Sequence, residues 1–266
     1  TCVPQSMPGL WKQVPRWLID PEGPVSIRLG HLPKLMPWVL RFLAAGRFER
    51  LDPVADGLFR LSRGSVAAYK KRLAGTGQEQ LVRDSMYVHV YRNPKAASLD
   101  HLGWQLRQAR QVPIELIDKR ALKEIEPHIA DDFEAAILIK QQGRASDPAG
   151  IGIALAEKAL AKGANHIQSK VQEIRPDQGS GCQLVTDQGV FTAKKIVLAA
   201  GVWSCQLLTR FGIKLPLEAE RGYHLVLRNP GIKINHSVMD ADQKYVASLM
   251  QACLLYTSPS PRDHQP

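Results

Sequence analysis

The stretch IVLAAG at residues 196–201 decides the fold class of this 266-residue chain. Its apolar run is typical of a strand that is buried on both faces, and small residues follow directly before a helix that we expect to begin near Val202-Trp203. In open α/β sheets, ligands bind beyond the carboxyl ends of strands, and small residues there let the backbone approach a cofactor closely. Tight turns also use Ala and Gly for packing alone, so both interpretations stay open on this motif.

The residues before this stretch contain a second helix start. An apolar strand is expected at residues 136–140. Asp147-Pro148 then places a capping residue beside a proline at the first helical position. Residues 151–162 form an Ala-rich helical segment that Gly163 ends. This part of the chain therefore predicts a strand followed by a well-delimited helix.

A hairpin separates that helix from the IVLAAG stretch. A strand is expected around residues 167–174, and two further strands, at 182–186 and 190–193, meet at Asp187-Gln188-Gly189. A last strand is expected at residues 195–199. Helix, strand, hairpin and apolar strand in this order are what a nucleotide-binding α/β domain with an inserted hairpin would show.

The first half of the chain mixes helices and strands. Residues 1–50 are rich in Pro and Trp and predict an irregular segment that leads into a short helix at 34–45. Asp52-Pro53 is a favourable helix start, and one long helix is expected from there to Gly75-Thr76-Gly77. Residues 81–91 alternate between apolar and polar side chains, which predicts a half-buried strand. Further helices are expected at residues 99–112 and at 119–125, the latter capped by Asp118.

Composition and charge restrict the class of protein. The chain is 44% hydrophobic and 23% charged, which is typical of a globular protein with a large core. Its formal net charge of +10 could mark nucleic acid or an anionic membrane surface as a partner. The basic residues are interleaved with acids, so we expect no nucleic-acid binding and favour a solvated basic surface, with contact to lipid as an option. The interleaving is seen at Lys119, Arg120, Lys123, Glu124 and Glu126.

Metal and disulfide chemistry have no sequence support. The four cysteines are spread without a CxxC motif or a Cys/His cluster, so we expect neither a metal site nor a disulfide framework. This favours a cytoplasmic protein, with peripheral contact on the inner face of the plasma membrane as an option. The histidines lack partner spacing, and we expect surface or capping roles for His89, His101, His128 and His166.

The order of motifs between residues 163 and 203 resembles the D-amino-acid oxidase superfamily of flavoproteins. The resemblance rests on Gly163-Ala164, Val171, residues 186–189 and residues 196–203. It implies FAD as the cofactor, with the backbone of Val171 at the adenine end and the Ala-Ala-Gly turn close by. The cofactor-binding residues expected from it are Val171, Ala199, Ala200, Gly201 and Trp203.

Within that superfamily, three segments are similar to the bacterial D-amino-acid dehydrogenases (small subunit). They are the Pro/Trp-rich N-terminal stretch, Arg221-Gly222-Tyr223-His224, and residues 244–248. The likeness implies oxidation of a D-amino acid to an imino acid, which is hydrolysed to the 2-oxo acid, with electrons passed to a quinone or another acceptor. The expected substrate-binding residues are Arg221, Tyr223 and His224, although Arg221 could instead pair with Glu218 or Glu220.

Two other functions stay open. The first is another enzyme of the same superfamily, acting on glycine, sarcosine, proline or a glycerol phosphate. The second is a binding protein that kept the fold without the flavin. No acid/base constellation can be identified, which fits either the flavin chemistry or the binding protein, and no catalytic residue is predicted.

The sequence departs from the family pattern at both ends. No GxGxxG fingerprint follows a first strand, because Gly75-Thr76-Gly77 and Gly150-Ile151-Gly152 both lack the third glycine. We therefore expect the first strand and turn to lie upstream of Thr1, and this chain by itself to be inactive. Residues 253–266 resemble a translated sequencing adapter, and residues 255–266 are expected to have no packed secondary structure.

These observations predict a mixed α/β (α+β) fold, in which a partial FAD-binding Rossmann-like domain is interleaved with an antiparallel-sheet substrate domain. Residues 163–174 and 195–201 should be neighbours in one nucleotide-binding layer, with Gly201 at a strand end. The expected division is 1–135 for helical and substrate-domain segments, 136–212 for the FAD-binding portion, 213–252 for substrate-domain strands and 253–266 for the tail.

Overall fold

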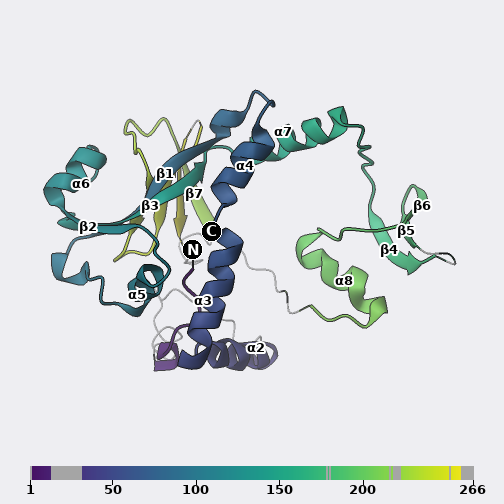
Figure 1. The fold of residues 1–266 in the computed structure, drawn as a ribbon, viewed down its shortest axis with the longest axis horizontal. Coiled ribbons are helices and arrows are strands. Elements are labelled where there is room, and N and C mark those ends of the chain that lie inside the picture. The colour runs from purple at the N-terminus through teal and green to yellow at the C-terminus, as the bar shows by residue number, and fades with distance from the viewer. Residues whose placement is uncertain are drawn as a thin grey trace. The chain divides into compact units, whose positions relative to one another are not determined.

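The chain folds into two compact units, whose elements are labelled in Figure 1. The computed structural model describes residues 2–12, 32–177, 179, 181–215, 217, 223–251 and 253–258. The larger unit comprises Thr1–Lys158 and Gly222–Pro266, and the smaller unit comprises Ala159–Arg221. The chain thus leaves the larger unit and returns to it, as an interleaved fold requires.

A seven-stranded mixed sheet forms the centre of the larger unit. Its strand order is β2-β3-β1-β8-β9-β10-β7. Neighbouring strands run antiparallel, except that β1 and β8 pair in parallel. The bounds are β1 Val82–Tyr91, β2 Ile114–Asp118, β3 Ala135–Ala145, β7 Tyr223–Arg228, β8 Ser237–Asp240, β9 Val246–Leu249 and β10 Cys253–Ser258.

Both faces of this sheet are covered where β1 and β3 pair. On one face, Val88 and Leu138 pack against Leu122 of helix α6 (Lys119–Ile125). On the opposite face, Ile137 packs against Trp104 of helix α5 (Leu102–Gln108). Burial on both faces explains the continuous apolar run of β3, since a strand with one solvated face would alternate.

The position of β3 corrects the expected domain boundary. Residues 136–140 were predicted to open the FAD-binding portion, but β3 pairs with β1 and β2 in the sheet of the larger unit. The prediction was wrong because an apolar run indicates burial without indicating which sheet buries it. The structural boundary falls at Lys158 instead, within helix α7 (Pro148–Ala161).

The helical segment before β1 also differs from the prediction. We expected one long helix that begins at Pro53, whereas helix α3 (Phe48–Ser62) starts earlier and helix α4 (Ser65–Leu73) follows it. Figure 1 shows α3 and α4 in succession. The break lies at Gly64, whose φ of 81° is left-handed and readily adopted by glycine. Helix α2 (Leu32–Ala45) precedes α3 and contains Pro37.

The predicted helix caps are confirmed. The Asp118 carboxylate accepts a hydrogen bond from the Ala121 backbone N–H at 2.9 Å, which caps α6. The Asp147 carboxylate accepts one from the Gly150 N–H, also at 2.9 Å, which caps α7. Short-range capping chemistry is therefore readable from sequence, because donor and acceptor are only three residues apart. Helix α5 is shorter than the predicted 99–112.

The tail prediction is wrong for residues 255–258. They belong to β10, which pairs with β9 on one side and β7 on the other. Leu254 of the same strand is buried with Ile234 and Ala247. The apolar residue at the start of the tail thus joins a small buried cluster, which the composition of the tail did not suggest. Residues 259–266 lie outside the described part of the chain.

Two buried carboxylates fix the segment that leads into β8. The Glu126 side chain is fully buried and accepts hydrogen bonds from the backbone N–H groups of Asn235 at 2.8 Å and His236 at 2.6 Å. Burial raises the pKa of Glu126 above its usual value, and these two donors oppose that shift. Asp240, also buried, accepts a hydrogen bond from Arg92 at 2.7 Å. Both contacts join segments more than a hundred residues apart.

The smaller unit contains a three-stranded antiparallel sheet followed by short helices. The order is β4-β5-β6, and the register pairs Thr186 with Gly189 across the β5–β6 turn, which confirms the predicted hairpin. Its elements are β4 Val171–Pro176, β5 Cys182–Thr186, β6 Gly189–Ala193, η5 Gly201–Trp203, α8 Ser204–Leu208 and η6 Thr209–Phe211.

Across both units, no helix among the described residues has the length and apolar character needed to span a membrane.

Candidate cofactor and substrate site

Val171 is the first residue of β4, where the strand meets the hairpin. It pairs with Thr186 of β5. The nearby Asp187 carboxylate accepts hydrogen bonds from the Ser169 hydroxyl at 2.6 Å and from the Lys170 N–H at 3.0 Å. These donors, the hydroxyl first, lower the pKa of Asp187. The main chain around Val171 is therefore held in place from the hairpin turn, as a backbone contact to a nucleotide would require.

The IVLAAG stretch is extended but forms no strand. Residues 195–200 belong to no ladder of the described chain, and the Val197 residue is 91% exposed. The predicted strand at 195–199 is thus wrong. The apolar pattern indicates a strand that needs neighbours on both sides, and no described strand pairs with this segment.

The small residues of this stretch lead into an open turn. Gly201 has a φ of 55°, and an added Cβ atom there would meet no atom within 4 Å apart from its neighbours. Ala199 and Ala200 precede it, and Trp203 in η5 is 70% exposed. The prediction that Gly201 lies at a strand end is wrong, but the backbone at this turn is accessible.

The structure brings the Gly201 turn and β4 into the same compact unit. Helix α8, which begins three residues after Gly201, contacts β4. Glu173 of β4 pairs with Arg175 at 2.6 Å and with Arg210 of η6. The Arg175 guanidinium, followed by the charge of Arg210, holds the pKa of Glu173 below its usual value. The Val171 strand and the helices after Gly201 are therefore joined directly.

Two of the predicted substrate residues, Tyr223 and His224, are the first residues of β7. Arg221 and the side chain of Tyr223 are outside the described part of the chain. His224 is exposed and pairs with Thr257 of β10. Leu227 of β7 is partly buried and packs against the cluster of Ile234, Ala247 and Leu254. Successive side chains of a strand point to opposite faces, so His224 lies on the face opposite Leu227, and its side chain is exposed. The structure places β7 in the larger unit, and Val171 and Gly201 in the smaller one.

His89 is a residue that sequence analysis misjudged. We expected a surface or capping role, but its ring contacts Tyr87 at 4.8 Å and Trp104 at 5.0 Å between centroids, both edge-on. Burial, together with the cations Arg107 and Lys244, lowers the pKa of His89 to about 4. Its Nε2 atom is buried and has no hydrogen-bond partner in the described residues. A neutral histidine therefore lies inside an aromatic layer.

The signal for this layer was present in the alternation of β1. Tyr87, His89 and Tyr91 share the face opposite Val88, and we interpreted that face as solvated. The missing information was α5, whose Trp104 covers it and whose Arg107 guanidinium lies 4.4 Å from the Trp104 ring centroid. His101, His128 and His166, for which surface or capping roles were also predicted, are exposed, and His128 Nδ1 lies 2.9 Å from the Lys233 carbonyl oxygen.

The family model described as DAO, FAD dependent oxidoreductase, matches residues 32–263. This match covers most of both compact units. The chain belongs to the DAO family. The FAD-dependent family resemblance drawn from residues 163–203 is thereby confirmed, and so is the mixed α/β fold.

Relatives of known name agree with this membership in the DAO family. The D-amino-acid oxidase of Bradyrhizobium diazoefficiens is 32% identical over 92% of this chain and 58% of its own length. The D-amino acid dehydrogenase of Rhizobium rhizogenes is 24% identical over 91% of this chain and 60% of its own length. The chain therefore spans less than two thirds of the length of these relatives.

Solved structures show the same fold. The glycine oxidase of Geobacillus kaustophilus superposes with a TM-score of 0.62 and is 23% identical over 80% of this chain and 58% of its own chain. At this identity the likeness concerns the DAO fold alone, and it carries no information about the substrate of the present chain.

The residues of the smaller unit fit part of an FAD site. The open turn at Gly201 would let a cofactor approach the main chain, and the two alanines before it add little bulk. Val171 and the residues after it supply strand backbone held by the hairpin. The sequence holds no GxGxxG turn, which supplies the N–H donors for the pyrophosphate in dinucleotide-binding folds. The chain's own residues thus fit main-chain contacts at the nucleotide end.

Proposed function

We propose that the complete protein containing this chain catalyses FAD-dependent oxidation of D-amino acids. The observation that carries the proposal is the 32% identity to a D-amino-acid oxidase over 92% of this chain. FAD, when bound, accepts two electrons from the substrate. The Cα–H bond would break with transfer of a hydride to the flavin, the amine nitrogen would lose a proton to solvent to give the imine, and water would hydrolyse the imino acid to a 2-oxo acid and ammonia.

In this proposal two sets of residues have different tasks. The backbone at Val171 and the turn Ala199–Ala200–Gly201 contact the cofactor, with Trp203 beside them. Arg221, Tyr223 and His224 contact the substrate. The open turn supports the first assignment, and the exposed position of His224 supports the second.

The electron acceptor is proposed to be a quinone or another external acceptor, because relatives include proteins named dehydrogenases. We further propose a cytoplasmic protein that contacts the inner face of the plasma membrane. The formal net charge of +10 supports this contact, because anionic lipids attract basic surfaces.

The test uses the product of the complete gene that encodes these residues. After desalting, flavin absorbance is recorded, and reduction of an artificial dye is followed with D-alanine, L-alanine, glycine, sarcosine and proline. We expect bound flavin and turnover with D-alanine and other D-amino acids. Turnover with glycine or sarcosine alone would replace the proposed substrate class, and a flavin-free, inactive protein would refute the enzyme.

A further inference from the structure

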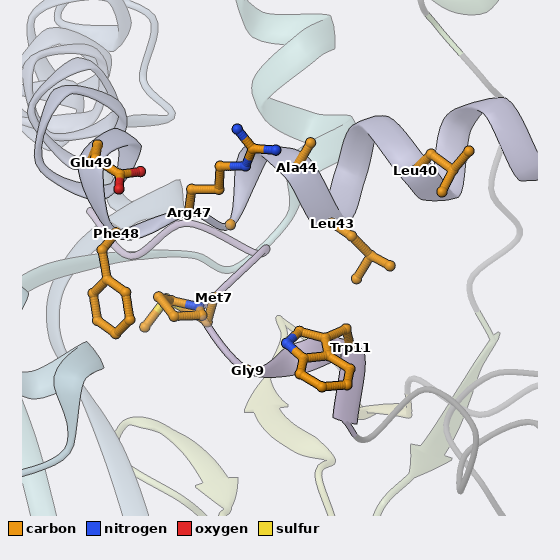
Figure 2. Close-up of a pocket in the computed structure, with 11 residues that line it drawn as sticks. Met7, Gly9, Trp11, Leu40, Leu43, Ala44, Arg47, Phe48 and Glu49 are labelled. Carbon is orange, nitrogen blue, oxygen red and sulfur yellow. The ribbon is translucent and has the colours of Figure 1, made fainter.

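A groove of mixed polar and apolar lining lies between the N-terminal segment and the junction of α2 and α3, within the larger unit. Its volume is about 790 Å³, and Figure 2 shows the side chains around it. The Ser6 hydroxyl donates a 2.6 Å hydrogen bond to the Phe42 carbonyl, which ties the segment to α2. Gly46 makes the close approach possible, since a Cβ atom there would lie 2.5 Å from Ser6 Oγ. The two walls of the groove are thus held together.

The rim of the groove exposes large apolar side chains. Trp11 and Leu40 are each 61% exposed, and Phe48 is 69% exposed. Figure 2 shows Leu43 of α2 directed toward Trp11, and Met7 beside Phe48. Met36 and Trp38, also on α2, add to the exposed apolar surface. Aromatic and aliphatic side chains that gather in this way mark an interaction surface, whereas scattered ones do not.

The same region is strongly basic. The described residues of the N-terminal segment, α2 and the start of α3 include a single acid, Glu49. The Lys12 ammonium lies 5.6 Å from the Trp11 ring centroid, so a cation and an exposed indole share one position. The basic residues are Lys12, Lys34, Arg41, Arg47 and Arg50.

We propose that this groove, together with the exposed cations Lys12, Arg41, Arg47 and Arg50 of the same segments, docks on an anionic phospholipid bilayer; we call it the Trp11 surface. Trp, Leu and Phe insert at the headgroup level, while arginines and lysines meet the phosphates. Association with a second copy would bring two sets of these cations together, so the charge favours an anionic partner. The inference gives a place to the membrane contact proposed above and rests on that proposal.

The experiment uses the 266-residue chain and vesicles of phosphatidylcholine, with or without phosphatidylglycerol. Co-sedimentation at low salt should occur with the anionic vesicles and weaken as NaCl is added. Arg41→Gln with Arg47→Gln should reduce the apparent affinity about 30-fold, from the usual contribution of each cation near such a surface. Trp11→Ser with Leu40→Ser should reduce it at least about 10-fold.

Matched controls come from α3 and α4. Leu61→Ser removes an apolar side chain that is 82% exposed elsewhere, and Lys71→Gln with Arg72→Gln removes two exposed cations from α4. Both controls should bind vesicles as the parent does. Circular dichroism checks that each variant is folded. If the apolar variant does not fold, the charge variant, which alters only exposed side chains, still tests the proposal.

Three results would overturn the inference. The first is equal binding to vesicles with and without phosphatidylglycerol. The second is a loss of vesicle affinity in the control variants as large as in the Trp11-surface variants. The third is the absence of vesicle binding together with a dimer that Trp11→Ser with Leu40→Ser disrupts. The last would make the groove a contact between copies. The binding assay needs neither FAD nor turnover, so a D-amino-acid oxidase that ignores vesicles would contradict this inference alone, and a vesicle-binding protein without activity would contradict the proposed function alone.

Discussion

The sheet of the larger unit and the IVLAAG stretch of the smaller one have similar composition and opposite surroundings. Val88 in β1 is fully buried between neighbouring strands, whereas Val197 is 91% exposed. Both valines lie in segments predicted to be strands, Val88 in the alternating residues 81–91 and Val197 in the apolar residues 195–199. The difference shows that an apolar run becomes a strand only when other segments supply its neighbours and its cover. The four predictions that follow, from the largest expected effect to the smallest, test this contrast.

The largest effect concerns cofactor retention. The 266-residue chain should hold FAD far more weakly than the complete gene product, by several powers of ten, and should not oxidise D-amino acids. The reason is that its sequence lacks the Gly-rich turn, and each charge-assisted hydrogen bond to the pyrophosphate contributes about 1.5 to 3 kcal/mol. Flavin absorbance after desalting measures this. Stoichiometric FAD in the 266-residue chain would show that the smaller unit needs no further phosphate contacts.

His89 should make the stability of the larger unit depend on pH. In the unfolded chain His89 binds a proton below about pH 6.5, whereas in the folded chain its pKa is about 4. Stability should therefore fall as the pH drops from 6.5 to 4, by about 3 kcal/mol from this group. His89→Phe should flatten that part of the urea-denaturation profile.

His166 in the smaller unit is exposed and serves as the control substitution. If His166→Phe changes the profile as much as His89→Phe does, the aromatic layer around His89 is not the cause.

The matched valines test packing directly. Val88→Ala should destabilise the larger unit by about 2 kcal/mol, because two buried methyl groups are lost and a cavity remains. Val197→Ala should change stability by less than about 0.5 kcal/mol, since the side chain is already in water. Chemical denaturation of both variants provides the comparison, and a large effect at Val197 would mean that its apolar run is covered in solution.

The smallest effect concerns Glu126. Glu126→Gln should cost about 1 to 2 kcal/mol, because one of the two backbone N–H groups loses its acceptor. Burial raises the pKa of Glu126 in the folded protein, so the folded state holds its proton to higher pH than the unfolded state does. This group therefore reduces stability as the pH rises through its titration, and the variant should lack that decline. The exposed Glu157 supplies the control, Glu157→Gln.

Sequence predicted local chemistry well. The caps at Asp118 and Asp147, the hairpin around Gly189 and strand β1 are confirmed, because each depends on residues a few positions apart. The helix start at Pro53 was wrong, since α3 begins at Phe48 and includes the proline. Local signals of this kind mark a preference that packing of the surrounding segment can override.

The sequence did not predict which segments, distant from one another along the chain, pack together. The membership of β3 in the larger sheet, the pairing of β10 with β7 and β9, and the burial of His89 under α5 all depend on partners distant in sequence. The proposed cofactor residues come from the order of motifs and stay a prediction, and the structure adds that Gly201 is open to an added Cβ. The groove at Trp11 was not predicted, because the Pro- and Trp-rich residues 1–50 indicated only an irregular segment and a short helix.

The central claim is that the turn at Gly201 contacts FAD in a D-amino-acid oxidoreductase. Gly212 offers a matched control, because it lies in the same unit, has a φ of 67° and is likewise open to an added Cβ. Valine at either position strains the backbone in the same way. In the complete gene product, the measurement is flavin absorbance per protein after desalting, with D-alanine-dependent bleaching of the bound flavin. The account predicts that Gly201→Val loses the flavin while Gly212→Val keeps it, and equal retention in both variants would contradict it.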